Sequence, residues 1–292
     1  PDGSLLQVAS YSNDLLNGTV VNYYSNSQVA EEANYTNGVL DGKVMTWYED
    51  GKIRFLKYYS NGQEDGKQVY YYENGNIREE SYKKEGLYDG EYRGYYKEYE
   101  YGALQKICFY NQGKLDGLFT GYYPSGSIMN TAEYRADTIF GLFRKYYDAG
   151  IKGDTGVLQE EGLYVNYRKQ GTWNLYYPDG NLYTSGKYNH GKFEGEWKIY
   201  YENGNLKQVG TFHEGNAEGE FKLYYETGEL KNKGIYRNNL KEGEWISYYT
   251  NGSIMTRIGF KEGERHGHAV AYNEEGRMVE EYIFEHGTET HP

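Results

Sequence analysis

The sequence predicts an all-β protein, an elongated single-layer antiparallel meander of tandem β-hairpins that forms an open-ended, solenoid-like twisted sheet. The first observation is a 24-residue unit that repeats along the 292-residue chain. The second is the composition, with 38 tyrosines, 39 glycines and only 4 prolines. Tyrosine favours pleated, half-buried surfaces, and glycine supplies the positive φ of tight turns. A fixed short period indicates an array that grows by stacking units rather than by enlarging one core.

The repeat is clearest in residues 195–218. Its frame is Gly at position 1, an aromatic residue at 3, an aromatic pair at 6 and 7, Gly at 10, an aliphatic residue at 12, an aromatic residue at 18 and Gly at 21. A partial repeat, residues 1–17, precedes eleven repeats. They begin at residues 18, 42, 66, 90, 117, 141, 171, 195, 219, 243 and 267. Because no linker or change in composition interrupts the array, we expect residues 1–292 to form a single repeat domain.

Each repeat has two segments of strand length, positions 2–7 and 12–18. Position 8 in the connection between them is Pro124 in one repeat and Pro178 in another. Proline fixes φ near −65°, which suits the first central residue of a type I turn and excludes a type I′ turn. We therefore expect a type I turn closed by a left-handed glycine in a G1 bulge, with Ser27 replacing this glycine in the first repeat. Positions 19–24 are expected to form the return turn.

Alternation along the strands divides the side chains between two faces. We expect positions 3, 7, 12, 16 and 18 on a packed face and positions 2, 4 and 6 on a solvated face. Position 16 is small in most repeats, as if a ring lies across it. The residues that show this are Ala33, Ser81, Cys108, Ala132, Gly162, Gly186, Gly210 and Gly234. With no second layer, the packed face must be covered by ring stacking between neighbouring repeats.

This hairpin unit, with Gly-x-aromatic, Tyr-Tyr-x-x-Gly and Tyr-x-x-Gly-x-x-x-Gly, resembles the MORN repeat. It looks most like the bacterial variant found in YwqK-type antitoxin proteins, and the resemblance covers essentially the whole chain. The resemblance implies a scaffold or protein-binding surface, and the YwqK type implies neutralisation of a partner toxin. It also slightly favours a cytoplasmic location, although a secreted or surface protein is also compatible with the sequence.

The net charge is −12, and Lys and Arg are scattered along the chain. Nucleic acids and anionic lipids are bound mainly through basic patches, so both are disfavoured as partners. A protein partner, either toxin-like or scaffolded, is expected. The two open terminal strands also favour a monomer or an end-to-end dimer.

The two insertions suggest where a protein partner binds. They lie on the same hairpin edge, at residues 99–101 and 148–161, and insertions gathered on one side of an array often mark the binding side. Neutral drift in loop length is the competing explanation. The candidate partner-binding residues are Tyr95, Tyr99, Tyr101, Tyr122, Tyr146, Asp148, Lys152 and Asp154.

A second candidate is an acidic edge at the junctions between later repeats, where a basic partner could dock. Its residues are Glu194, Glu196, Glu218, Glu220, Glu242 and Glu244. Turn chemistry on a solvated edge would explain the same residues without a partner.

The row of position-6 aromatics, Tyr in every repeat except for Trp47, supports an alternative function. Such a row could bind a carbohydrate or the cell wall, or it could only stiffen the sheet through cross-strand contacts. Catalysis is not expected, because the six histidines lie at or beside turns and Cys108 takes a small packing position. We expect no metal and no cofactor.

Overall fold

The computed structural model describes residues 6–98 and 102–290, and every regular element in these residues is a β-strand. The all-β prediction is therefore confirmed. The described residues form no helix that is long and apolar enough to cross a membrane. The chain divides into two compact units. Unit 1 comprises residues 1–141 and 146–156, and unit 2 comprises residues 142–145 and 157–292. That the whole chain is a single domain stays a prediction.

The strands of unit 1 are β1 (Gln7–Ser12), β2 (Leu15–Tyr23), β3 (Val29–Thr36), β4 (Val39–Trp47), β5 (Ile53–Ser60), β6 (Gln63–Glu64), β7 (Gly66–Tyr71), β8 (Ile77–Lys84), β9 (Leu87–Tyr95), β10 (Leu104–Asn111), β11 (Lys114–Leu115), β12 (Gly117–Tyr122) and β13 (Ile128–Arg135). Residues of β14 (Thr138–Tyr146) belong to both units.

The strands of unit 2 are β15 (Leu158–Val165), β16 (Arg168–Tyr176), β17 (Leu182–Asn189), β18 (Lys192–Tyr200), β19 (Leu206–His213), β20 (Asn216–Tyr224), β21 (Leu230–Arg237), β22 (Leu240–Tyr248), β23 (Ile254–Lys261), β24 (Glu264–Tyr272), β25 (Met278–Glu285) and β26 (Thr288–Thr290).

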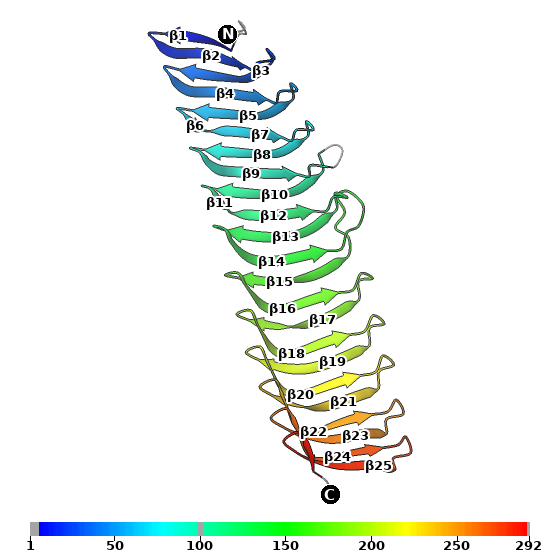
Figure 1. Ribbon diagram of the computed structural model, residues 1–292. Helices are drawn as coiled ribbons and strands as arrows, with labels where there is room; N and C mark the ends of the chain where they lie inside the picture. The colour runs from blue at the N-terminus through cyan, green and yellow to red at the C-terminus, as the bar shows by residue number, and fades with distance from the viewer. Residues whose placement is uncertain (1–5, 99–101, 291–292) are drawn as a thin grey trace. The chain divides into compact units, whose positions relative to one another are not determined.

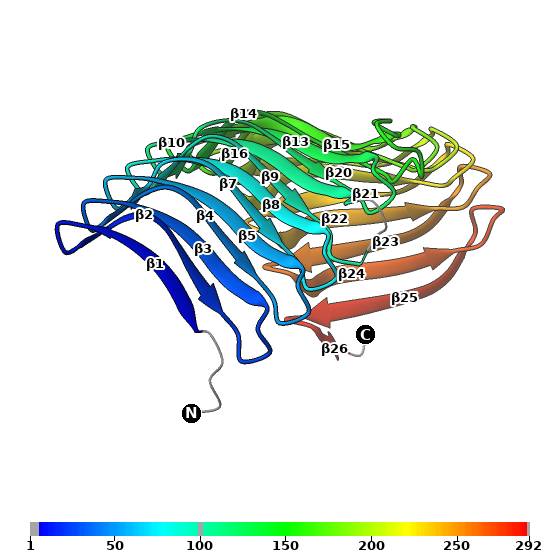
Figure 2. The same ribbon diagram turned by 90° about the horizontal axis from the view of Figure 1, so that it is seen from above.

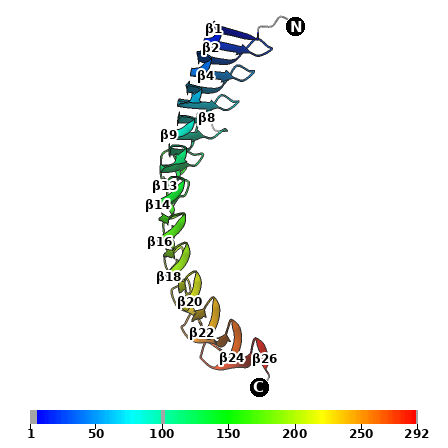
Figure 3. The same ribbon diagram turned by 90° about the vertical axis from the view of Figure 1, so that its left-hand side faces the viewer.

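Within each unit, successive strands pair antiparallel, as β2 does with β3, β3 with β4, and β16 with β17 (Figure 1). The short strands β6 and β11 precede β7 and β12, and each pair takes the place of one strand. The strands bend along their length (Figure 2), and each unit is one sheet layer thick (Figure 3). The prediction of a single-layer antiparallel meander of hairpins is therefore confirmed within each unit.

The connection at positions 8–11 has the predicted geometry. In the second repeat the Gly51 amide donates to the Tyr48 carbonyl at 2.9 Å, and the Tyr48 amide donates to the Lys52 carbonyl at 2.8 Å. Gly51 has a φ of 84°, and Ser27 adopts a φ of 67° in its place in the first repeat. This is the type I turn closed by a left-handed G1-bulge residue.

The return turn is tighter than positions 19–24. Strand β3 continues to Thr36 and β4 begins at Val39, so the turn consists of Asn37 and Gly38 alone. Both residues have positive φ, 50° and 81°. Positive φ at both central residues defines a type I′ turn, whose twist matches that of the flanking strands. The prediction was too long because strand pairing extends almost to the turn.

Two irregularities recur in the register. Where β3 pairs with β4, Ala33 lies opposite Val44 and Tyr35 lies opposite Leu40. Strand β4 therefore bulges around Gly42, whose φ is 105°. Glycine adopts this conformation without a steric penalty, which explains Gly at position 1. Where the first strand of a repeat pairs with the second strand of the same repeat, the register shifts between positions 5 and 6.

The second irregularity changes the place of the position-12 aliphatic residue. In the repeat that begins at residue 195, Tyr200 at position 6 lies opposite Leu206 at position 12. Residues directly opposite on paired strands are close side-chain neighbours. Position 12 therefore accompanies the position-6 aromatic, whereas the sequence had grouped it with the rings at positions 3 and 18. Alternation counting failed here because the bulge adds one residue.

The ring predicted to lie across position 16 belongs to position 3 of the next repeat. Trp173 is 0% exposed and lies against Gly162, where a Cβ atom would come within 2.2 Å of the indole. Gly186 and Gly210 have the same relation to Trp197 and Phe221. We call the face that carries positions 3, 16 and 18 the ring face, and it holds the main packing of both units.

Candidate binding surfaces

The tyrosine at position 7 joins neighbouring hairpin tips. The hydroxyl of Tyr24 donates to the carbonyl of Trp47 at 2.6 Å, and that of Tyr201 donates to the carbonyl of Tyr224 at 2.8 Å. The acceptor is position 6 of the following repeat. The same bond is made by Tyr48, Tyr72, Tyr96, Tyr123, Tyr177, Tyr225 and Tyr249. This half of the Tyr-Tyr pair therefore connects the repeats.

The position-6 row is half-buried and lies on the face opposite the rings. The Tyr95 hydroxyl donates to Oε2 of Glu80 at 2.6 Å, and the Tyr176 hydroxyl donates to Oε1 of Glu161 at 3.1 Å. Burial and the hydrogen bond to Glu80 raise the pKa of Tyr95 to about 12. Burial also raises the pKa of Tyr122. These rings therefore lie on a partly covered surface, and the hydroxyls of Tyr95 and Tyr176 already make hydrogen bonds within the protein.

The candidate site at the hairpin tips is partly described. Tyr95, Tyr122 and Tyr146 occupy position 6 of three successive repeats, and all are half-buried. Tyr99 and Tyr101 lie outside the described residues.

The loop at residues 148–156 folds over the preceding hairpin tip. Oδ1 of Asp148 accepts hydrogen bonds from the hydroxyls of Ser125 and Ser127, both at 2.6 Å. These bonds hold the pKa of Asp148 below its usual value. The Ile128 amide donates to the Asp154 carbonyl at 2.8 Å. Asp148 and Asp154 therefore organise the loop, and the exposed side chain of Lys152 lies beside Gly126.

The acidic edge consists of two separate rows. The position-24 carboxylates are half-buried and accept a backbone amide from the next return turn. Glu194 accepts from Glu214, Glu218 from Asn238 and Glu242 from Glu262, at 2.9–3.0 Å. The position-2 carboxylates are exposed and pair with cations, as Glu196 does with Lys198, Glu220 with Lys222 and Glu244 with Arg257. The sequence could not show that the first row caps turns.

The side chains that could take part in catalysis, Cys108, His213 and His268, lie in burial or ion-pair environments. Cys108 is 1% exposed, and burial raises the pKa of its thiol, which disfavours the reactive thiolate. His213 lies 3.2 Å from Glu194, and His268 lies 2.8 Å from Glu281, on exposed surface. In the part of the chain that the structure describes, no group of three or more His, Cys, Asp or Glu side chains could hold a metal ion.

The ring face of unit 2 is an open aromatic surface. A hollow of about 280 Å³ lies on β16–β19, lined by Leu175, Tyr183, Thr184, Tyr188, Phe193, Trp197, Ile199, Gln208 and Phe212. The rings of Phe193 and Trp197 are 4.4 Å apart, and those of Tyr188 and Trp197 are 5.2 Å apart. Phe193 remains 37% exposed. Sequence reasoning recognised these rings as packing but missed that they also line a surface open to solvent.

The ring face of unit 1 is more polar in its central strands. Oε1 of Glu64 lies 2.5 Å from Nζ of Lys57, and its other oxygen bonds Lys83. Burial opposes the charged form of Glu64, but these two lysines hold its pKa below the usual value. Glu79 accepts the hydroxyls of Tyr88 and Tyr92 at 3.1 and 3.2 Å. These carboxylates are satisfied within the protein.

The sequence model of one family matches the chain. It is described as the MORN repeat variant, and its eight matched segments cover more than half of the chain. The segments are residues 16–37, 40–61, 64–84, 115–136, 169–190, 193–214, 217–238 and 241–262. Residues 85–114 and 137–168, which contain the two insertions, and residues 263–292 fall outside these matches. No curated protein matches the chain.

Among solved structures, similarity is found to parts of much larger chains. The crystal structure of TcdB2–TccC3–Cdc42 is 12% identical, with a TM-score of 0.18, over 95% of this chain and 19% of that chain. The crystal structure of TcdB2–TccC3 is also 12% identical, with a TM-score of 0.17, over 95% of this chain and 20% of that one. The structure of the Photorhabdus luminescens Tc holotoxin pore with the mutation TccC3-D651A is 12% identical, with a TM-score of 0.17, over 91% of this chain and 19% of that chain. The chain thus spans about a fifth of these relatives, and TM-scores this low carry no functional inference.

Proposed function

Because the chain belongs to the MORN repeat family, we propose that it is a non-enzymatic protein-binding module, of the antitoxin, immunity or scaffold type, that holds a segment of its partner on the ring face of unit 2. Arrays of this family are generally repeat modules for binding and are generally non-enzymatic. The observation that carries the proposal is the hollow on β16–β19, where rings needed for packing also remain open to solvent.

The chemistry of the hollow indicates what kind of segment fits. Aromatic rings offer a large contact area at low entropic cost, and interface energy concentrates in such anchors. The net charge of −12 favours a partner with basic residues. We therefore propose a segment with apolar anchors flanked by lysine or arginine.

The test is selection of binding peptides from a displayed random library, followed by affinity measurement on substituted protein. Replacing both Phe193 and Tyr183 with Ser should weaken the selected peptides at least ~10-fold, since truncated anchors typically cost more than 1 kcal/mol each. Leu163→Ser is the matched control, because Leu163 is 46% exposed on the opposite face of unit 2. Equal loss in both variants would contradict the ring-face site.

Two competing placements have separate signatures. If the partner binds the hairpin tips instead, Tyr122→Ser and Lys152→Glu should weaken binding, while the Phe193 and Tyr183 substitutions should not. Carbohydrate binding is the alternative function, supported by the tyrosine row at position 6. A glycan that binds the protein and is lost on Tyr200→Ser and Tyr224→Ser would favour this alternative. Co-purification of one stoichiometric protein partner would favour the first proposal.

A further inference from the structure

Strand β24 differs from the other long strands of unit 2 in the side chains that it places on the ring face. Its positions 3 and 5 are Ala269 and Ala271, both small, and position 1 is glycine as in the other repeats. Position 3 carries a large ring in each of β16, β18, β20 and β22. These rings are Trp173, Trp197, Phe221 and Trp245.

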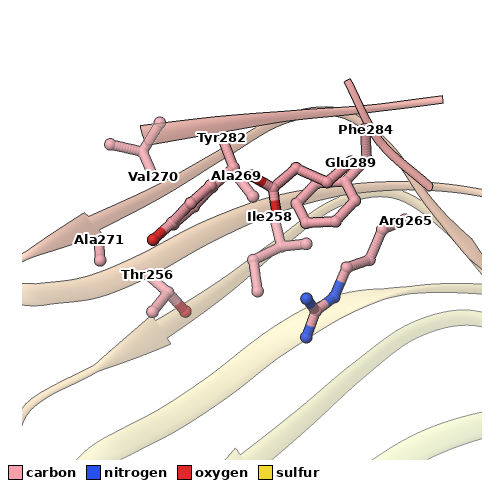
Figure 4. Close-up of a pocket in the computed structure, with 9 residues that line it drawn as sticks. All are labelled: Thr256, Ile258, Arg265, Ala269, Val270, Ala271, Tyr282, Phe284 and Glu289. Carbon is pink, nitrogen blue, oxygen red and sulfur yellow. The ribbon is translucent and has the colours of Figure 1, made fainter. Parts of the chain in front are cut away.

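The small residues leave a furrow along β24. Its volume is about 260 Å³, and it is bounded by Thr256 and Ile258 of β23, by Tyr282 and Phe284 of β25 and by Glu289 of β26 (Figure 4). Ile258 stands at position 16, where Gly234 and Gly210 stand in earlier repeats, and it fills part of the space of the missing ring. The remaining volume exceeds the ~150 Å³ of an apolar cavity that accepts benzene.

A cation remains beside the position from which the ring is missing. At position 23 of two earlier repeats, Nζ of Lys169 lies 3.8 Å from the Trp173 ring and Nζ of Lys241 lies 4.4 Å from the Trp245 ring, whereas Phe193 and Ala217 occupy this position before Trp197 and Phe221. Arg265 has this position before Ala269 and lies at one end of the furrow (Figure 4). Its guanidinium carbon is 5.3 Å from the Phe284 ring.

We propose that the furrow on β24 binds a planar aromatic group, an aromatic side chain of the bound protein segment, which takes the place of the missing position-3 ring. The aliphatic and aromatic walls would contact the ring, and Arg265 would lie over its face as the lysines lie over Trp173 and Trp245. The hydroxyls of Thr256 and Tyr282 would orient a polar group at the other end. This inference rests on the proposed function for the origin of the ring, but the furrow can be tested without that partner.

The probe is N-acetyl-L-tryptophanamide, titrated into the whole protein and followed through the methyl NMR signals of Ile258, Ala269 and Ala271. We expect saturable shifts at these methyls. Ala269→Trp places a ring in the furrow and should lower the affinity at least ~10-fold. His268→Trp is the matched control, because His268 is the neighbouring residue on β24 and its exposed side chain lies on the opposite face. It should change the affinity less than ~2-fold.

A second set of measurements keeps the test decisive if Ala269→Trp disturbs folding. Ala271→Leu fills the other end of the furrow and should also weaken the probe. Arg265→Gln should weaken it about 5-fold, and Arg265→Lys should retain most of the affinity, as expected for a cation–π contact. N-acetyl-L-leucinamide should bind more weakly than the tryptophan probe.

Three results would overturn the inference. They are the absence of saturable shifts up to the solubility limit, undiminished binding to both filled variants, and equal binding of the leucine and tryptophan probes. Failure of the proposed function is distinguishable, because peptides insensitive to the Phe193 and Tyr183 substitutions would disprove the hollow on β16–β19 while leaving probe binding at β24 intact.

Discussion

The two units solve the same packing problem with different pairs of residues at positions 16 and 3. In unit 2 the pairs are glycine with a large ring, such as Gly162 with Trp173 and Gly234 with Trp245. In unit 1 the pairs vary: Ala33 pairs with Val44, Lys57 precedes Gln68, and Ser81, which has a Cβ atom, pairs with Tyr92. The comparison shows that a larger side chain at position 3 requires a smaller one at position 16. A ring can lie flat on the backbone only where position 16 lacks a Cβ atom.

The position-3 side chain also donates a hydrogen bond to a backbone carbonyl. Nε1 of Trp173 donates to the carbonyl of Leu163 at 3.1 Å, and Nε1 of Trp245 donates to that of Ile235 at 3.2 Å. In unit 1, Nε2 of the fully buried Gln68 donates to the equivalent carbonyl of Tyr58 at 3.1 Å. This carbonyl lies beside the bulge, where the ladder is interrupted. Gln68 therefore replaces the hydrogen bond of tryptophan without its ring.

The largest expected difference between the units is the cost of removing the position-3 side chain. Trp173→Ala should reduce the free energy of unfolding by about 4 kcal/mol, because it empties a fully buried site. Val44→Ala should cost about 2 kcal/mol, since it removes two methyl groups. Urea denaturation followed by circular dichroism measures both. Similar costs would show that ring size does not set the stability of the repeats.

A double-mutant cycle tests directly whether the sizes of the side chains at positions 16 and 3 depend on each other. Gly234→Ala places a Cβ atom about 2.2 Å from the Trp245 indole and should cost about 3 kcal/mol. Adding Trp245→Val recreates the Ala33–Val44 pair of unit 1. The double variant should then be more stable than the sum of the two single effects predicts, by at least ~1 kcal/mol. Strict additivity would contradict the proposed coupling.

The polar ring face of unit 1 should make it the more acid-sensitive unit. The pKa of Glu64 is held below its unfolded value, so its contribution is present above the unfolded pKa and is lost as pH falls through the folded pKa. The amide protection factors in β5–β8, which correct for the intrinsic pH dependence of exchange, should fall below about pH 4.5 in the wild type. Glu64→Gln should already exchange faster at neutral pH and show less additional change. Identical pH profiles would exclude this ion pair as the cause.

The smallest expected effect concerns the acidic edge. Glu218→Gln retains an acceptor for the Asn238 amide and should cost less than about 0.5 kcal/mol, whereas Glu218→Ala should cost about 1 kcal/mol. Thermal unfolding of both variants measures the difference. If Gln and Ala are equally destabilising, charge rather than hydrogen bonding explains the row.

The sequence alone determined the repeat, the strands, the type I tips with their left-handed glycines and the ring across position 16. Each of these follows from local rules, namely the allowed φ of Pro178 and Gly51 and the absence of a side chain at Gly186. The tight return turns were missed because the sequence does not show how far pairing continues before Asn37. The place of position 12 was missed because a bulge shifts the register by one residue.

Only the tertiary structure decided what the side chains do. Glu218 and Tyr201 are ordinary surface residues in the sequence, and their roles depend on a backbone group one repeat away. Likewise, whether Phe193 is buried or lines a hollow depends on what covers the ring face, and the furrow at Ala269 depends on two neighbouring strands. Periodicity determines which residues face the same way only where no bulge intervenes, and contacts between repeats determine which of them remain open to a partner.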